Sequence, residues 1–312
     1  MNRYEVTDIV VGTDGSDPAT EAVDTAIAVA AAVGARVHPC AVVDPFPMGQ
    51  RVTDVERNRQ EAASFVEDAA DRAREAGVEA VPEVRRGSPY KELVAHVAET
   101  DADLLVLGTH GRGGTRRVLL GSVAEAVIRT AEVPVLTVHG DDEIRDWGPD
   151  SDVLVATDGS DAALPAEQVS VDLTAALGGR LTAVSAVDES RALASIGAGT
   201  VSDGVAESVR TALTEGATAA LDRVRERADE RGVPLTTEIL DGEAGRRIRE
   251  HAATVDADLV VVGTHGRRGI RRIMLGSVAE RVVRSADRPV LVVPAVMGAT
   301  DSEDGRDATD AA

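Results

Sequence analysis

The two halves of the chain repeat each other, and this repeat limits the possible folds more than any other feature of the 312-residue sequence. The segment 8–17, DIVVGTDGSD, is matched by 152–161, DVLVATDGSD. Farther along, 101–111 is matched by 256–266, and LGSVAE stands at both 120–125 and 275–280. Such self-similarity predicts two copies of one structural unit.

The offset between matching segments changes along the chain. The first pair is 144 residues apart and the later pairs are 155 apart, so the second half holds 11 additional residues. We expect them within 190–202, which is rich in small side chains. The predicted organisation is a first domain at 1–140, a polar linker at 141–150, a second domain at 151–296 and a disordered acidic tail at 297–312.

Short apolar runs alternate with helical segments in each half. In the first half, strands are predicted at 9–13, 37–43, 79–84, 104–107 and 135–138. Helices are predicted at 18–33, with Asp17 as its N-cap, and at 54–76, 89–98 and 122–130. This alternation predicts an α/β fold with a parallel sheet covered on both faces. Because 135–138 and 290–293 each follow a proline, as edge strands tolerate, we expect them to pair antiparallel.

Composition excludes several classes of function. The chain has 54 acidic and 33 basic residues, a net charge of -21, and only 2% aromatic residues. Nucleic-acid binders need a basic face and often stacking aromatics, so we expect no nucleic-acid partner. We find no apolar run long enough for a membrane helix and no signal peptide, and we therefore expect no membrane association and a cytoplasmic location.

Two further features of the composition concern the cell that makes the protein. Cys40 is the only cysteine, which excludes a disulfide framework, and we expect a buried, inert thiol. Lys91 is the only lysine, and acidic residues cover both halves. Such a surface either keeps the protein in solution or adapts it to high salt, where screening weakens the repulsion between acids. We favour salt adaptation.

Three motifs in each half fall beyond the carboxyl ends of the predicted strands, where parallel sheets bind ligands. Asp-Gly-Ser follows strand one at 14–16 and 158–160. Gly-Thr-His-Gly follows strand four at 108–111 and 263–266. After nine more residues, Gly-Ser opens the last helix at 121–122 and 276–277.

This three-part pattern predicts phosphate binding. Glycines let the backbone approach a ligand, and the free N–H groups of a helix start face an anion. Nearby arginines add positive charge, at 112, 116 and 117 and at 267, 268, 271 and 272. The alternative is that the glycines only form turns and Ser122 only caps its helix. Neither a Walker A motif nor a G-x-G-x-x-G motif after strand one is present.

The spacing G-x-x-G, nine residues, G-[ST], with an aspartate closing strand one, resembles the ATP-binding branch of the universal stress protein family in a tandem form. The resemblance covers about 6–138 and 153–293. It implies two tandem doubly wound domains, each with strand order 3-2-1-4-5, related by a pseudo-twofold axis through their last strands. With the acidic composition, it also suggests a halophilic archaeal member.

The resemblance implies an adenine nucleotide as ligand, ATP or AMP, with Mg²⁺ or Mn²⁺ accompanying the triphosphate. The aspartate after strand one would lie near the nucleoside, the end of strand two would hold adenine through its backbone, and the glycine motifs would contact ribose and phosphates. The residues so implied are Asp14, Val42 or Val43, Gly108, Gly111, Gly121, Ser122 and Val123 in the first half, and Asp158, Ala186 or Val187, Gly263, Gly266, Gly276, Ser277 and Val278 in the second.

Three functions stay open at this point. The favoured one is a stress-response module that binds and senses a nucleotide, ATP or AMP, and regulates an unknown protein partner. The others are a slow ATPase or self-phosphorylating enzyme, and a dimerisation module without nucleotide. His110 and His265 are the candidates for a general base, but no carboxylate stands near them in sequence, so we expect no catalytic residue and no Cys/His metal site. The internal pseudo-dimer could also pair with a second chain.

One departure separates the halves. The first half has Ser88-Pro89 before its third helix, and the second has Glu243-Ala244. We expect the helix start without proline to be weaker, and the pocket to be intact in both halves.

Overall fold

The computed structural model describes residues 3–45, 52–109, 120–139, 147–195, 202–264 and 275–297. Its strands form one ten-stranded sheet in the order β3-β2-β1-β4-β5-β10-β9-β6-β7-β8. The first half supplies β1 (Asp8–Gly12), β2 (Arg36–Val43), β3 (Glu83–Arg86), β4 (Leu104–Gly108) and β5 (Val135–Val138). The second half supplies β6 (Asp152–Ala156), β7 (Arg180–Val187), β8 (Leu235–Asp241), β9 (Leu259–Gly263) and β10 (Val290–Val293).

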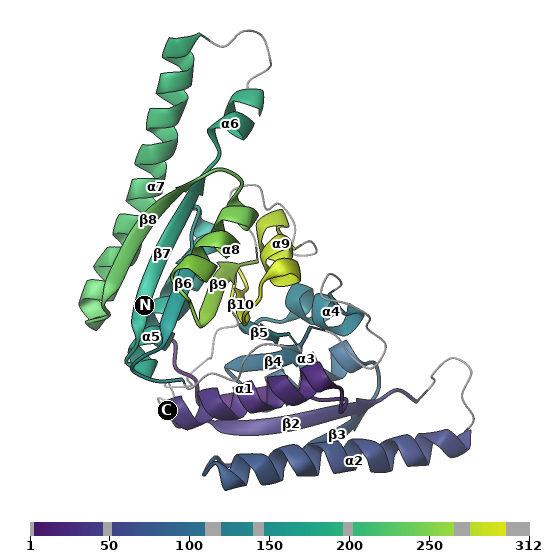
Figure 1. Ribbon diagram of the computed structural model, residues 1–312. Helices are drawn as coiled ribbons and strands as arrows, with labels where there is room; N and C mark the ends of the chain where they lie inside the picture. The colour runs from purple at the N-terminus through teal and green to yellow at the C-terminus, as the bar shows by residue number, and fades with distance from the viewer. Residues whose placement is uncertain are drawn as a thin grey trace, which may run out of the picture.

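Helices cover both faces of this sheet (Figure 1). One face is covered by α1 (Asp17–Val33), α2 (Val52–Glu75), α5 (Leu164–Leu177) and α7 (Asp203–Arg231). The other is covered by α3 (Pro89–Glu99), α4 (Ser122–Thr130), α8 (Ala244–Thr254) and α9 (Ser277–Ser285). Each half is therefore doubly wound with strand order 3-2-1-4-5, as the sequence predicts.

The two half-sheets join through their last strands, which confirms the predicted antiparallel pairing. Leu136 lies opposite Leu291, and Thr137 lies opposite Val290. The hydroxyl group of Thr137 also donates to the Val290 carbonyl over 3.1 Å. On both faces of the sheet, the apolar cores run across this seam and contain residues from both halves. The two halves thus share their hydrophobic cores.

The third strand differs from the prediction. It begins at Glu83 rather than at residue 79, and Ala80 forms only an isolated bridge to Val37. Pro82 stands between the bridge and the strand, and it has no N–H group to donate to a ladder. In the second half Thr237 takes this position, and β8 runs without a break from Leu235.

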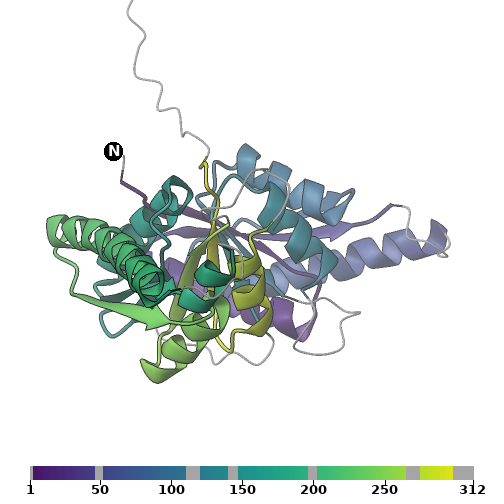
Figure 2. The same ribbon diagram turned by 90° about the horizontal axis from the view of Figure 1, so that it is seen from above.

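The additional residues of the second half give the region between strands two and three a different shape. A short helix, α6 (Glu189–Ser195), follows β7, and α7 has 29 residues against 24 in α2. Figure 2 shows these two long helices at opposite ends of the molecule. The part of the predicted insertion at 196–201, the linker residues 140–146 and the tail residues 298–312 lie outside the described residues.

The predicted N-cap of the first helix is corrected by the structure. Helix α1 begins at Asp17, so its N-cap is Ser16, whose carbonyl accepts from Thr20 N over 2.9 Å. The start of α8, unlike that of α1, has a side-chain cap: the Glu243 side chain accepts from the N–H groups of Gly245 and Arg246. A carboxylate at an N-cap satisfies free donors and suits the helix dipole, so this helix start is not left unsatisfied by the loss of proline.

Candidate functional site

The Asp-Gly-Ser turn has the same geometry in both halves. In the first half, Asp14 Oδ1 accepts from the Ser16 N–H over 3.0 Å and from the Ser16 hydroxyl over 2.6 Å. In the second half, Asp158 accepts from Ser160 over the same two distances, 3.0 and 2.6 Å. These bonds orient one carboxylate at the carboxyl end of β1 and one at that of β6.

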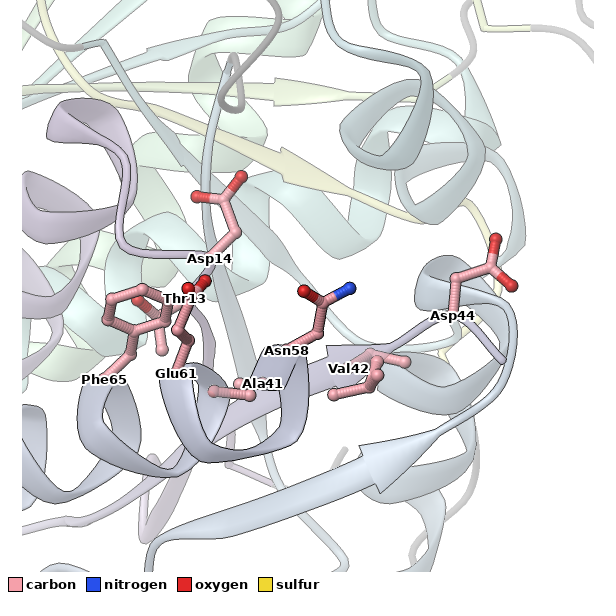
Figure 3. A pocket seen from close by; sticks show the side chains of 10 residues that line it. Thr13, Asp14, Ala41, Val42, Asp44, Asn58, Glu61 and Phe65 are labelled. Carbon is pink, nitrogen blue, oxygen red and sulfur yellow. The ribbon is translucent and has the colours of Figure 1, made fainter. Parts of the chain in front are cut away.

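A pocket of about 210 Å³ opens beside this turn in the first half (Figure 3). The ends of β1 and β2 supply one wall, and α2 supplies the other. Pockets for drug-sized ligands measure about 300–1,000 Å³, so this pocket has room for only part of such a ligand. The lining residues are Thr13, Asp14, Ala41, Val42, Val43, Asp44, Asn58, Glu61, Ala62 and Phe65.

The structure thus brings together three residues singled out from the first half: Asp14 and both candidates at the end of β2, Val42 and Val43. Their counterparts Asp158 and Ala186 stand at the matching ends of β6 and β7, since Ala156 and Val184 pair in the same register as Gly12 and Cys40. By this register Cys40 corresponds to Val184.

The starts of α4 and α9 are the second candidate element. Gly121 and Gly276 occupy the N-cap positions in extended conformations, and neither helix has a side-chain cap. Gly121 N donates to Thr109 O over 2.7 Å, and Gly276 N donates to Thr264 O over 2.8 Å. Each helix start is therefore attached to the end of its central strand. The N–H groups of the first turn, which include those of Ser122 and Val123 or Ser277 and Val278, are oriented for an anion.

Gly108, at the end of β4, has a structural reason to be glycine. A Cβ atom there would lie 2.7 Å from the carbonyl group of Pro18 at the start of α1. Close packing of helix and strand thus requires a glycine, whether or not a ligand approaches. Gly263 ends β9 at the matching position. The other predicted loop residues lie outside the described residues: Gly111, Gly266, His110, His265 and the arginines at 112, 116, 117, 267, 268, 271 and 272.

The comparisons with known proteins agree with this architecture. The sequence model of the Universal stress protein family matches residues 5–139 and 151–294. The chain belongs to the universal stress protein family. A universal stress protein of Mycolicibacterium smegmatis is 31% identical over 297 residues, which cover 91% of this chain and 96% of that protein.

Two further relatives come from archaea. A universal stress protein of Methanocaldococcus jannaschii is 38% identical over 141 residues, 45% of this chain and 80% of that protein. The crystal structure of a universal stress protein from Archaeoglobus fulgidus superposes with a TM-score of 0.70 at 21% identity, over 94% of this chain and 97% of that one. The last likeness shows that the tandem chain shares the fold of that protein.

Sequence reasoning missed the residues that this universal stress protein places on α2. Asn58, Glu61 and Phe65 line the pocket from one face of the helix. Their spacing of three and four residues was a usable signal, and aromatic residues are rare in this chain. Phe65 also packs against the turn: a Cβ atom at Gly15 would lie 2.5 Å from its ring, and Gly15 has φ +73°.

In the second half, an ion pair between a buried carboxylate and a half-buried arginine supports the same turn. Glu167, at 0% exposure, accepts from the hydroxyl group of Thr157 over 2.6 Å and pairs with Arg223 over 2.6 Å. A second guanidinium nitrogen of Arg223 donates to the carbonyl group of Gly159 over 3.3 Å. The hydrogen bond with Glu167 raises the pKa of Arg223. Sequence reasoning did not find this pair.

The cysteine of β2, Cys40, is not among the residues that line the pocket. Burial raises the pKa of the Cys40 thiol to about 12, so the thiol is protonated and unreactive near neutral pH.

Within the described residues, no three His, Cys, Asp or Glu side chains are grouped as a metal site. The same residues include no helix that is both long and apolar enough to span a membrane.

His96 gives a prediction for the pH dependence of stability. It is 1% exposed, and among the described residues its Nε2 has no hydrogen-bond partner. Its Nδ1 lies 3.4 Å from Arg85 and 3.6 Å from Glu83, and His38 packs edge-on at 6.0 Å between ring centroids. Burial lowers the pKa of His96. The contribution of neutral His96 to the free energy of unfolding is therefore fully present above the ordinary histidine pKa of about 6.5. It is lost as the pH falls toward the lower pKa of the folded state.

We expect His96→Gln to reduce the loss of stability between about pH 7 and pH 5, because glutamine does not titrate. Urea unfolding of both proteins at a series of pH values measures this. If the free energy of unfolding falls by the same amount between about pH 7 and pH 5 in the wild type and in the variant, His96 does not cause the pH dependence.

Proposed function

We propose that this universal stress protein binds one adenine nucleotide, ATP or AMP, in each half, and that the bound nucleotide regulates its contact with a protein partner. One observation carries the proposal: both halves place an oriented aspartate and an uncapped helix start beyond the carboxyl ends of their strands. The aspartate suits the donor groups of a nucleoside, and the helix start suits phosphates.

The charges around the site support the same placement, with the nucleoside beside the aspartate and the phosphates at the helix start. Three carboxylates line the first-half pocket, from Asp14, Asp44 and Glu61. Like charges repel, so a phosphate is disfavoured there and belongs at the start of α4. A divalent ion, Mg²⁺ or Mn²⁺, would accompany ATP through its phosphate oxygens. A cytoplasmic location, salt adaptation, the predicted domain limits and a further homodimer stay predictions from the sequence.

A carboxylate placed at the helix start tests the proposal. Gly121 has φ -63° and ψ 148°, a conformation that suits aspartate, which is a favoured N-cap residue. We expect Gly121→Asp to weaken ATP binding in the first half by about tenfold or more, because the new charge repels the phosphates. The melting temperature should stay unchanged or rise.

Isothermal titration, at the same ionic strength for every variant, measures both sites on the full chain. The wild type should bind about two ATP per chain, from the presence of the pattern in both halves. Gly276→Asp is the matched variant of the second half and should leave the first site intact, while the double variant should lose both. ATP binding that both substitutions leave unchanged would refute the assignment of the helix starts, and a wild type that binds neither ATP nor AMP would refute the proposed function.

A further inference from the structure

The helices that cover the two sites differ in the residues that they present. Helices α2 and α7 end in the same way: Val78 N donates to Ala73 O, and Val233 N donates to Ala228 O, over 2.8 and 2.9 Å. The glycine before each valine has a left-handed conformation. Both helices run without interruption back from these ends, so residues 155 apart in sequence occupy matching places.

This register identifies the second-half counterparts of the pocket residues. Asn58 corresponds to Leu213, Glu61 to Gly216 and Phe65 to Ala220, whereas the alanine beside them is kept as Ala62 and Ala217. Burial supports the match, because Ala62 and Ala217 are both buried, at 6% and 1% exposure. The amide, the carboxylate and the aromatic ring of the first half are thus replaced by apolar or absent side chains.

The first-half pocket is built to receive hydrogen-bond donors. Figure 3 shows Asn58 and Glu61 extending from α2 on the side where Asp14 and Asp44 stand. A carboxylate only accepts hydrogen bonds, and an amide both donates and accepts, a combination that matches the edge of an amino-bearing purine. The second half keeps Asp158 and Asp188 at its strand ends but has no counterpart of either polar group on α7.

We propose that Asn58 and Glu61 make the first half selective for a nucleobase that carries an exocyclic amino group, and that the second half binds purine nucleotides without this selection. The inference rests on the proposed function, since it assumes that the pocket holds the base. Under this assignment, the tandem chain has one site that discriminates between purine bases by their exocyclic amino group and one site that does not.

Two ligands that differ in one group test the inference: ATP, and purine riboside 5′-triphosphate, which lacks the 6-amino group. Hydrogen exchange during titration of the full chain reports each half separately, through peptides of β2–α2 and of β7–α7. For the wild type, we expect the first half to bind purine riboside triphosphate about tenfold more weakly than ATP. The second half should bind both within about twofold.

Variants assign the preference to the named side chains. In Asn58→Ala/Glu61→Gln the first-half preference should disappear while the second half is unchanged. Leu213→Ala, at the place that matches Asn58, is the control and should leave the first-half preference intact. Glu61→Gln alone keeps the side-chain shape and should reduce the preference if the double variant folds poorly.

The outcomes separate this inference from the function on which it rests. Equal affinity of the wild-type first half for both triphosphates overturns the inference, and so does a first-half preference that survives in Asn58→Ala/Glu61→Gln. If neither half is protected by ATP or AMP, the proposed function itself fails, and the inference fails with it.

Discussion

Replacing Arg223 by alanine is expected to lower the free energy of unfolding by about 3–5 kcal/mol near neutral pH, because it leaves a buried carboxylate without its partner. Glu167 is fully buried, and its remaining hydrogen bond comes from Thr157. Urea unfolding of the wild type and the variant at about pH 8 measures this loss.

The first half supplies the control for this prediction. There, Val23 occupies the place of Glu167, 144 residues earlier, and it is buried at 2% exposure. The fold therefore accepts an apolar residue at this place. We expect Glu167→Val/Arg223→Met to recover most of the lost stability, since replacing both partners of a buried pair by apolar residues is often neutral or stabilising. A double variant less stable than Arg223→Ala would show that the pair stabilises the fold beyond mutual neutralisation.

Replacing Leu136 by alanine at the seam is expected to cost about 2–5 kcal/mol and to destabilise both halves together. Leu136 and Leu291 lie opposite each other across the seam and are 2% and 1% exposed. Their shared core extends into each half, so a cavity there removes contacts from both. Denaturation followed by circular dichroism and by Trp147 fluorescence should give one coincident transition, shifted to lower urea.

A core leucine away from the seam provides the comparison. Leu154 lies in β6 of the second half and is 0% exposed. Leu154→Ala should also shift the whole transition if the two halves unfold as one unit. Two resolved transitions would show instead that the halves unfold independently, if Leu136→Ala shifted only one of them and Leu154→Ala shifted only the other.

Sequence patterns predicted the order of strands and helices because buried parallel strands are short apolar runs, and the repeat allowed each half to check the other. The bounds of α4 and β5 match the prediction. The start of β3 could not be inferred from apolar residues alone. It depends on Pro82, which interrupts pairing where Thr237 permits it.

For the candidate site, the motifs located Asp14 and the starts of α4 and α9, because strand ends and helix starts carry local signals. The α2 residues were not found, since the helical pattern does not tell which strand end a helix covers. The pair between Glu167 and Arg223 joins residues 56 positions apart. It depends on the packing of α5 against α7, which no local pattern records.

The antiparallel seam also determines where the two halves are accessible. Because β5 and β10 run in opposite directions, the strands of the first half end on one long edge of the sheet and those of the second half end on the other. In Figure 1, β2 runs toward the far end of α2, and β7 runs toward α6. A molecule docked on one edge leaves the other edge accessible. The two candidate sites of a single chain thus open at opposite edges of one sheet, an arrangement that a protein with one such half reaches only by dimerising.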